Sequence, residues 1–508
     1  MITICRRTLL QGSAAVGALS LANVWPVSAT DPKTRYSAFS VEGRKALASY
    51  AKAVAVMHDR SRQDATDPLG WTYQYKMHWY PDDGDSLVLP DGGIDWARLE
   101  RDQIAELDSF FGPPGTGNVK RSQAEATWGK CPHSNSSTIA LDFMPWHRLY
   151  LFFFERIVRK LSGDDEFTLP YWGYMDAKAS QVLPPGFDVA GSPLRHDRSP
   201  ASNQGDPMSP SFFDGKFWSD PAFPVFTRAV EGTPHGVVHN FVGDGNRDMA
   251  SLFQSPRDPV FWLHHCEIDR IWEGALKTGF KPPGGAWLNN THSFFDENGV
   301  LVKATNNDAL NTQQIKDWPG YLYHDVPAPP SGPVAAMQAL NLESRPRHTL
   351  AVAENVSLHT GLQTNSLTAA PAMGTFAVNS LTAAGNRRVK LEISNVTLDR
   401  RAVANIALYL NAPADAKGEA LRKYEVGVLS TFSILPGPTD LHAAHAPSGP
   451  PNVLSFDVTR LLTELQREGR WPDQLRLTTM EITGSLAGAE LRLGKVELVE
   501  TSTSGPLQ

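Results

Sequence analysis

The chain has little cysteine, no long unbroken apolar run and no surplus of positive charge. Its 508 residues include 3 cysteines, and 47 Lys and Arg stand against 54 Asp and Glu, which gives a formal net charge of −7. A net negative charge argues against nucleic acid as a partner. The apolar stretch near the N-terminus is short and broken by glycine and alanine, which argues against a membrane span. The length predicts two domains plus any targeting segment.

Residues 1–29 resemble a twin-arginine export signal. Arg6 and Arg7 precede an Ala-rich stretch, and the sequence VSA at 27–29 forms a small-residue cleavage pattern. We therefore expect export to the periplasm or the extracellular space; a membrane anchor is the alternative. Cleavage removes two arginines and no acidic residue, so the formal charge falls from −7 to −9. Because this route carries folded proteins, the signal also points to a cofactor loaded before export.

The hydrophobic pattern changes once along the chain. Residues 30–325 carry helical periodicity between loops rich in glycine, proline, asparagine and aspartate. Residues 326–340 are rich in proline and predict a linker. Short alternating runs over 341–500 predict the strands of an all-β domain. The predicted fold class is therefore a mainly α domain followed by an all-β, sandwich-like C-terminal domain.

Three of the predicted helices carry a histidine near their first turn. Each begins with a proline at its first position, and two of them also have a capping side chain before it. The predicted starts are Pro145, Thr233 with Pro234, and Asp258 with Pro259, and the first of these helices ends at Gly163. A further helix is predicted over residues 41–58.

The second of these helices carries a histidine pair. His235 and His239 are four residues apart, so both imidazoles can face one metal ion. Exposed or core-capping histidines are the alternative. A zinc protease of the HExxH type has a glutamate where Gly236 stands, so that interpretation lacks its general base.

The third helix adds one more inward histidine. His265 is predicted to face the core with Asp269, a carboxylate one turn later that we expect to orient the imidazole. His264 points about 100° away on a helix and is expected to flank the site rather than bind. His235, His239 and His265 thus predict a site of three nitrogen ligands, which suits copper or zinc.

Upstream histidines predict a second site of the same kind. His147 shares a helical face with apolar residues, and His133 and His78 precede it in the chain. Cys131 and Cys266 both stand near a histidine, in CPH and HHC, which favours metal-site chemistry over a disulfide.

The stretches FMPWHRLYLFFFE (143–155), HGVVH (235–239) and DPVFWLHHCEID (258–269) resemble the two copper-binding signatures of the tyrosinase and catechol oxidase family. The resemblance implies a four-helix bundle around a type-3 centre of two copper ions, with O2 as co-substrate. It also implies the ligands of each ion, which are His78, His133 and His147 for the first copper and His235, His239 and His265 for the second. The sequence YLY at 321–323 is similar to the tyrosine motif that closes the family's catalytic domain.

The first copper site departs from the family pattern. His133 lies fourteen residues before His147, farther than is usual, and a loop insertion around 136–141 would explain the distance. Cys131 and His133 resemble the Cys-x-His of fungal-type members, in which the cysteine forms a thioether to the histidine. The alternatives are a free Cys131 or a pair with Cys266. His58 is the rival of His78 as a ligand.

The resemblance implies oxidation of a small phenolic substrate: ortho-hydroxylation of monophenols and oxidation of o-diphenols to o-quinones. Glu231 matches the family's glutamate that holds a water near the coppers, although a helix-start charge is the alternative. Monophenol-active members are expected to have asparagine directly after His235, where Gly236 stands, whereas Asn240 follows His239. A catechol oxidase without monophenol hydroxylation is therefore the alternative to a tyrosinase.

The C-terminal region loosely resembles that of plant-type polyphenol oxidases, in which this domain often covers the copper pocket and keeps the enzyme latent. A stabilising or oligomer-forming domain is the alternative, and a homo-oligomer is therefore possible under that alternative.

Two functions from other classes are also considered. A haemocyanin-like oxygen carrier is disfavoured by the absence of repeats. A zinc hydrolase is disfavoured by the missing HExxH glutamate.

Overall fold

The computed structural model describes most of the chain after residue 30. The described residues are 31–81, 95–115, 117–133, 139–219, 222–245, 247–329, 347–369, 387–432, 434, 453–468 and 475–502. The predicted signal at 1–29 and most of the predicted linker at 326–340 lie outside them. Within the described ranges, every helix is too short or too polar to cross a lipid bilayer.

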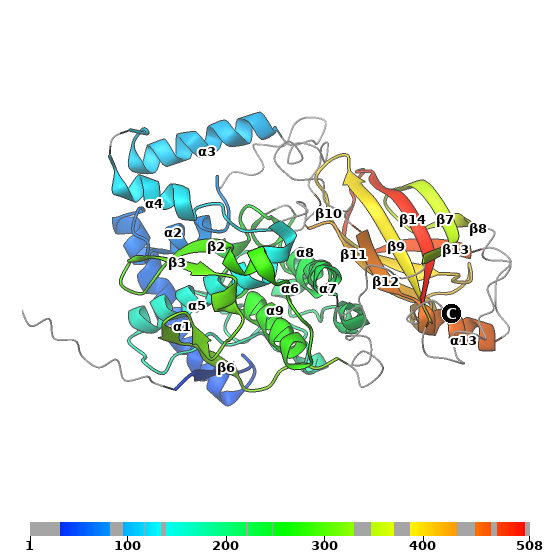
Figure 1. Cartoon of the computed structure of the whole chain (residues 1–508), viewed down its shortest axis with the longest axis horizontal. Helices are drawn as coiled ribbons and strands as arrows, with labels where there is room; N and C mark the ends of the chain where they lie inside the picture. Colours follow the sequence, from blue (N-terminus) through cyan, green and yellow to red (C-terminus); the bar gives the residue numbers. More distant parts are fainter. Residues whose placement is uncertain are drawn as a thin grey trace, which may run out of the picture. The chain divides into compact units, whose positions relative to one another are not determined.

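The first part of the chain is mainly helical, as predicted, and is called the helical domain below (Figure 1). Its helices are α1 (Val41–Gln63), α2 (Trp71–Lys76), α3 (Trp96–Phe111), α4 (Val119–Thr127), α5 (Phe143–Ser162), α6 (Pro200–Asn203), α7 (Phe223–Val230), α8 (Val237–Val242) and α9 (Val260–Lys277). Short strands complete it: β1 (Lys33–Arg35), β2 (Thr291–Phe295), β3 (Leu301–Thr305), β4 (Gln314–Ile315), β5 (Trp318–Pro319) and β6 (Tyr321–Tyr323).

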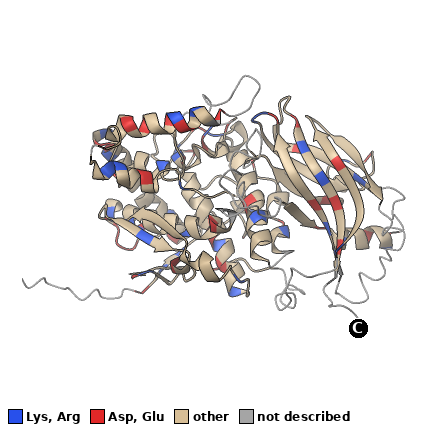
Figure 2. Ribbon diagram, turned by 45° about the horizontal axis from the view of Figure 1, so that its top comes forward, with Lys and Arg blue, Asp and Glu red and all other residues tan. Residues whose placement is uncertain are grey.

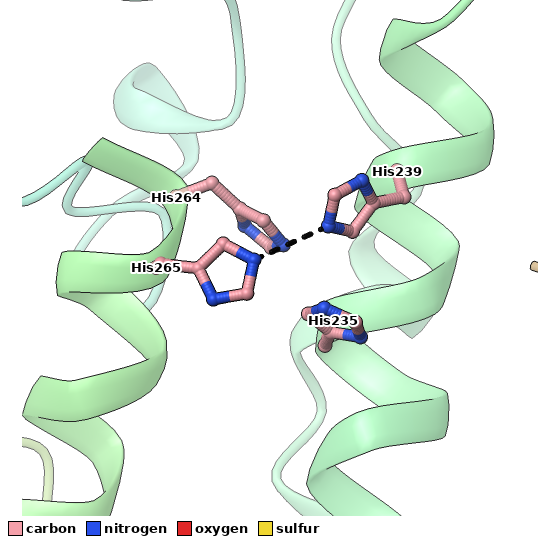
Figure 3. Close-up of side chains that lie close together, drawn as sticks. All are labelled: His235, His239, His264 and His265. Atoms are coloured by element: carbon pink, nitrogen blue, oxygen red, sulfur yellow. Dashed lines mark hydrogen bonds between the residues drawn. The ribbon is translucent and has the colours of Figure 1, made fainter. Parts of the chain in front are cut away.

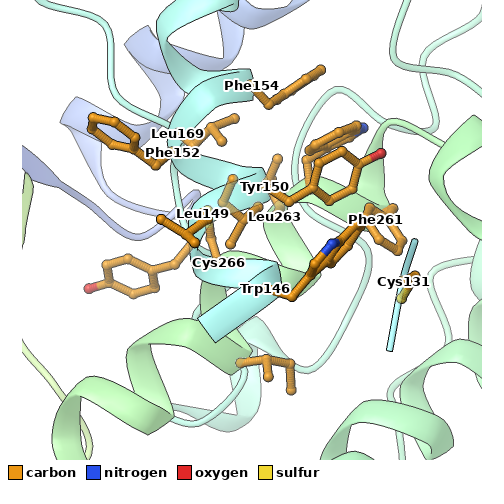
Figure 4. Close-up of a cluster of buried hydrophobic side chains, with 14 of the residues drawn as sticks. Cys131, Trp146, Leu149, Tyr150, Phe152, Phe154, Leu169, Phe261, Leu263 and Cys266 are labelled. Carbon is orange, nitrogen blue, oxygen red and sulfur yellow. The ribbon is translucent and has the colours of Figure 1, made fainter. Parts of the chain in front are cut away.

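Helix α5 lies in the core between α1 and α9, and its side chains are buried over almost its whole length (Figure 4). Phe154 of α5 stacks on Trp262 of α9 with ring centroids 3.4 Å apart and an interplanar angle of 8°. Burying one such large side chain stabilises the fold by about 1.5–3 kcal/mol. These contacts fix the helices on which two of the predicted metal ligands lie.

The helix ends follow the predicted signals with small shifts. Gly163 ends α5 with φ of 69°, a left-handed conformation that favours glycine. The helix begins at Phe143, so Pro145 stands inside its first turn rather than at its first position. Asp258 accepts a hydrogen bond from the Val260 backbone N at 2.9 Å and also forms a buried ion pair with Arg198 at 2.7 Å. The start of α9 is therefore held by a charged pair as well as by its cap.

A buried polar network closes the helical domain around Asp269. Arg148 forms an ion pair with Asp269 at 2.5 Å, and the hydroxyls of Tyr321 and Tyr323 both donate to the same carboxylate. Arg35 lies over the Tyr321 ring at 3.4 Å and pairs with Glu155 at 2.7 Å. Strand β1 pairs in parallel with β6, which brings the two ends of this domain together. The tyrosine motif therefore does have a closing role in this structure.

The C-terminal part, called the β domain below, is one antiparallel sheet with the strand order β11-β10-β13-β8-β7-β14-β9-β12. Its strands are β7 (Arg347–Leu358), β8 (Gln363–Ala369), β9 (Arg387–Leu398), β10 (Val403–Leu410), β11 (Glu425–Ser430), β12 (Val453–Asp457), β13 (Leu475–Ser485) and β14 (Leu491–Ser502), with short helices α12 (Glu419–Arg422) and α13 (Thr459–Arg467). The predicted helical and all-β organisation is confirmed. In place of two stacked layers, the sheet curls until its two edge strands approach each other. A Cβ on Gly427 of β11 would lie 2.6 Å from the Phe456 ring of β12.

Strand β10 is buried on both faces. A strand with one face in the core and one in solvent would instead alternate between buried and exposed residues. Ile406 and Leu408 belong to the core of the β domain. Asn405 is also fully buried, and its side-chain amide donates to the Val237 backbone O of α8 at 2.9 Å. The second face of β10 is thus covered by the helical domain.

Charged residues lie mainly on the surface and mix both signs. Figure 2 shows Lys and Arg together with Asp and Glu along α3 and on the sheet of the β domain. Exposed pairs such as Arg98 with Asp102 on α3, at 3.3 Å, contribute about 0–1 kcal/mol each. The described surface therefore presents mixed charge over these elements rather than a basic stripe.

Candidate metal centre

Six buried histidines gather in two adjoining groups in the helical domain. The first histidine group is His78, His133 and His147, and the second histidine group is His235, His239 and His265. All six are at most 7% exposed. The rings of His147 and His265 stack across the two groups with centroids 4.4 Å apart, and those of His133 and His235 lie 5.8 Å apart. The structure brings together every histidine that was predicted to bind metal.

The second histidine group comes from two facing helical segments (Figure 3). His235 lies in the π-helical segment Glu231–Gly236, His239 in α8 and His265 in α9. His235 Nδ1 lies 3.0 Å from the Glu231 backbone O, and His239 Nδ1 lies 2.7 Å from the Met249 backbone O. These bonds place the proton on Nδ1 and leave Nε2 with a lone pair, which is how metal-binding imidazoles are oriented.

The free nitrogens of this group point toward one another. His239 Nε2 and His265 Nε2 are 3.4 Å apart. Among the described residues no hydrogen-bond partner is found for His235 Nε2. A buried polar nitrogen without a partner is costly unless something else binds it. The donor set therefore fits a metal ion.

Two expectations about α9 are corrected by the structure. His264 does not merely flank the site, because its ligand nitrogen lies with those of His235, His239 and His265, all within 4.8 Å of one another. A helical offset of about 100° still allows both neighbours to reach a centre that lies between their directions. Asp269 does not orient His265, because its carboxylate is taken up by Arg148 and the two tyrosines.

The first histidine group is built mainly from irregular backbone. His78 follows the end of α2, and His133 lies beyond α4, while only His147 is helical. Backbone hydrogen bonds join the first two segments: Lys130 N donates to Met77 O at 3.1 Å, and Cys131 N donates to His78 O at 3.2 Å. The position of this group therefore depends on a pairing between distant segments.

Cys131 belongs to the first group as well. Its sulfur and the ligand nitrogens of His78 and His133 all lie within 4.8 Å of one another, and the sulfur is 3.3 Å from His147 Nε2. Burial raises the pKa of the Cys131 thiol well above its usual value, which favours the protonated form. Cys131 and Cys266 are both buried and form no disulfide, and Cys266 lies in the aromatic core around α5 (Figure 4).

Burial favours the neutral form of five of these imidazoles. It lowers the pKa of five of the six well below the usual value, and neighbouring histidines add to this effect. The same cause lowers the pKa of His264 to about 3. Neutral nitrogen ligands suit copper or zinc, whereas calcium and magnesium prefer oxygen.

Glu231 links the two groups. Its carboxylate Oε1 lies 3.0 Å from His133 Nδ1, while its backbone O lies 3.0 Å from His235 Nδ1. The residue is 1% exposed and continues the helical backbone of α7, and the helical path is then interrupted at Thr233, whose φ of −144° and ψ of 116° are extended. Glu231 therefore contacts the ligand shell of both groups and is not a charge at a helix start.

Gly236 and Asn240 follow His235 and His239 and lie against the β domain. The Asn240 amide donates to the Ala404 backbone O at 3.0 Å, to Asn405 Oδ1 at 3.1 Å and to Ser430 Oγ at 3.0 Å. A Cβ on Gly236 would lie 2.8 Å from Ser430 Oγ. Both positions therefore contact the C-terminal domain in this structure.

Phe432 of the β domain stacks directly on a histidine of the second group. Its ring centroid lies 4.1 Å from that of His239 at an interplanar angle of 11°, and 5.5 Å from that of His235. The distance to the first group is larger, 6.3 Å to His133. Sequence reasoning missed this residue, because a phenylalanine after a predicted strand carries no signal of where it docks.

His58, the rival ligand, lies away from both groups. It is on α1 beside Trp71, with ring centroids 5.2 Å apart, and lines a cavity of about 190 Å³. His78 is therefore the residue that the structure places with the other predicted ligands.

Family models match most of the helical domain and the β domain. The common central domain of tyrosinase matches residues 102–219 and 211–274, and the polyphenol oxidase middle domain matches 285–331. A domain of unknown function matches 344–501. The matches to the first two models contain five of the six grouped histidines, and His78 precedes them.

Similar proteins cover most of the chain or a part of it. The chain is 27% identical to tyrosinase HcTyr1 of Hahella sp. over 92% of this chain and 99% of that protein. It is 30% identical to polyphenol oxidase A1 of Vicia faba over 37% of each chain. Among solved structures, latent apple tyrosinase shares the fold with a TM-score of 0.58 at 20% identity, covering 94% of this chain and 98% of that one.

Proposed function

Because the chain belongs to the tyrosinase and polyphenol oxidase family of type-3 copper oxidoreductases, we propose that it oxidises phenols with O2, hydroxylating monophenols at the ortho position and converting o-diphenols to o-quinones. The family centre holds two copper ions. The observation that carries the proposal is the meeting of six buried histidines, four of which have Nδ1 within 3.0 Å of an oxygen, so that Nε2 is the nitrogen left to bind a metal. A catechol oxidase without monophenol hydroxylation is the alternative.

The first copper is assigned to the first histidine group and the second copper to the second histidine group. Bound copper would supply the exchange of electrons with O2. The protein holds neutral nitrogens in place, excludes water through burial and supplies an aromatic surround for a phenol. Phe143 contributes to that surround, since its ring lies 4.6 Å from His147 and 5.0 Å from His235.

Glu231 is proposed to position a water or a phenol proton between the groups. Its carboxylate is buried and hydrogen-bonded to His133, so it lies within reach of a molecule at the histidines. Gly236 offers no side chain for this task, and the Asn240 amide is bonded to the β domain. Whether monophenols react therefore depends on Glu231 and on the position of the β domain.

The β domain is proposed to keep the enzyme latent. Phe432 covers the His239 ring, so a phenol cannot occupy the same face while the domain is docked. Replacing Phe432 with alanine in the full chain is expected to raise catechol oxidation about tenfold or more, because opening this face converts a rarely accessible site into an accessible one. Equal rates for the variant and the parent would contradict latency through this residue.

A thioether between Cys131 and His133 is also proposed. The sulfur lies within 4.8 Å of the ligand nitrogens of His78 and His133. The bond replaces an S–H and a ring C–H by S–C, and O2 at the copper centre would take the two electrons and two protons. Export by the twin-arginine route, with copper loaded beforehand, is proposed from the arginine pair in residues 1–29.

The test of the proposed function is O2 uptake by the copper-loaded protein. Tyramine and then catechol are supplied to the full chain and to the Phe432→Ala variant, with zinc-loaded protein as control. Uptake with both substrates supports a tyrosinase, and uptake with catechol alone supports the alternative. No uptake with either substrate, by either protein, would overturn the proposal.

A further inference from the structure

Ser430, the last residue of β11, connects the β domain to Gly236 and Asn240, the residues that follow His235 and His239. Its Oγ accepts from the Asn240 amide at 3.0 Å and from the Phe432 backbone N at 3.2 Å. The same oxygen lies 2.8 Å from where a Cβ on Gly236 would stand. One small side chain therefore contacts Gly236 and Asn240 and also fixes the backbone of Phe432.

Gly236 is not required by its own backbone conformation. Its φ of −64° and ψ of −33° are those of an ordinary right-handed helix. Alanine would be favoured there by about 1 kcal/mol on helix propensity alone. The space explains the glycine instead, because an added Cβ would lie 2.8 Å from Ser430 Oγ and 3.1 Å from Ser430 Cβ. The two closest atoms belong to Ser430 of the β domain, and the Glu231 backbone O of the helical domain follows at 3.2 Å.

The contact continues from Ser430 to the histidines. Phe432 follows Ser430 by two residues, is held by the Ser430 side chain and stacks on His239 at 4.1 Å. Thr233, three residues before Gly236, donates through its hydroxyl to the Val428 backbone O of β11 at 3.1 Å. Displacing Ser430 from the helix would therefore move the segment that carries Phe432.

We propose that residue 236 decides whether the β domain can close over the histidine groups, so that a side chain at position 236 and a closed domain exclude each other. Glycine lets Ser430 reach Asn240 and seat Phe432 on His239. Any larger residue lifts β11, uncovers His239 and frees the Asn240 amide. The position next to the first histidine of the second group thereby sets substrate access through domain docking. The consequence for turnover rests on the proposed function, whereas the docking itself does not.

The test uses full-length variants and measures docking without relying on activity. Hydrogen–deuterium exchange is followed in residues 237–242 and 403–410, together with catechol oxidation by copper-loaded protein. Gly236→Ala is expected to speed exchange in both segments about tenfold or more and to raise catechol oxidation in parallel. The matched control is Gly232→Ala in the same π-helical segment, where an added Cβ would meet no atom within 4 Å. It should behave as the parent does.

A double variant separates the steric contact from a local effect on the helix. Ser430→Gly removes the two closest atoms that an added Cβ would approach and leaves the Glu231 backbone O at 3.2 Å, so Gly236→Ala with Ser430→Gly should exchange more slowly than Gly236→Ala alone. Ser430→Leu supplies the same clash from the β-domain side and serves if Gly236→Ala does not fold. Parent-like exchange in both Gly236→Ala and Ser430→Leu, or no protection in the double variant, would overturn the proposal.

The two proposals fail in different ways. If exchange follows the predicted pattern but no variant oxidises catechol, the docking role of residue 236 stands and the proposed function fails. If every variant oxidises catechol at the parental rate and exchange is unchanged, the docking role fails and the proposed function stands.

Discussion

The two histidine groups reach the same kind of geometry by different means. In the second group all three rings come from helical segments, and two are four residues apart on one path. In the first group His78 and His133 lie on irregular backbone that is held by backbone hydrogen bonds from Lys130 to Met77 and from Cys131 to His78. Helical periodicity fixes the direction of a side chain locally, whereas the first group is positioned by tertiary pairing. The second group should therefore be the more robust of the two.

The largest expected effect is a loss of copper and of activity, and it distinguishes His265 from the adjacent His264 of α9. Replacing His265 with alanine should reduce bound copper from two ions to one and lower catechol oxidation by about 100-fold or more, since even a residue that only hydrogen-bonds a ligand contributes about 10- to 100-fold. His264→Gln should keep both ions, because the three histidines assigned to the second copper, His235, His239 and His265, are all retained. Copper analysis after gel filtration provides the measurement. Loss of copper in the His264 variant alone would reverse the assignment.

A smaller loss is expected at the residue that joins the groups. Glu231→Ala removes the oxygen that orients His133 but leaves the backbone oxygen that orients His235. Copper affinity should fall by about 10- to 100-fold, and for the first ion more than for the second. Chelator titration followed by metal analysis tests this, with Glu166→Ala as control because that side chain is 83% exposed. Equal weakening of both ions would contradict the stated difference between the groups.

Cys131→Ser is expected to lower the copper affinity of the first histidine group by less than Glu231→Ala does. If the cysteine is joined to His133, the copper-loaded parent should be two hydrogens lighter than its sequence requires, and the variant should show the full mass. The loss of a covalent tie to an irregular segment should lower affinity for the first copper about tenfold, as it would for a lost supporting contact. Intact-mass spectrometry decides the first point. A parent of full mass would remove the thioether.

The sequence predicted the second group better than the first for a physical reason. His235, His239 and His265 follow from helix periodicity, and the flanking Asp258 and Gly163 signals were local as well. The family resemblance then implied that the two sets of three histidines hold a pair of copper ions. The inward turn of His264 and the partners of Asp269 could not be predicted, because each depends on how whole helices pack. Phe432 and the glycine at 236 have meaning only through a contact between residues far apart in the chain.

The smallest expected effect concerns a histidine outside both groups that supports the second one. His196 forms an ion pair with Asp248 at 3.1 Å, and the next residue, Met249, holds His239 Nδ1 through its backbone O. Burial of the ring opposes its charge, but the hydrogen bond to Asp248 and the charges of Asp258 and Asp248 outweigh burial, so the pKa of His196 is raised. A raised pKa in the folded state means that the stabilisation is complete below the unfolded value near 6.5 and is lost as pH rises through the folded value.

His196→Gln should therefore lower stability at pH 5.5 and have little effect at pH 8.5. The expected cost at the lower pH is about 0.5–1 kcal/mol, which corresponds to about 1–2 °C in Tm for a helical domain of roughly 300 residues. Thermal unfolding of copper-free protein at both pH values gives the difference without interference from metal release.

His58→Gln is the matched control, because burial together with the charges of Arg62 and His196 lowers the pKa of His58. Neutral His58 is favoured in the folded state, so stability from this group is lost as pH falls below about 6.5, the opposite sign to His196. The same pH dependence for both variants would show that the Asp248 pair does not support the loop beneath His239.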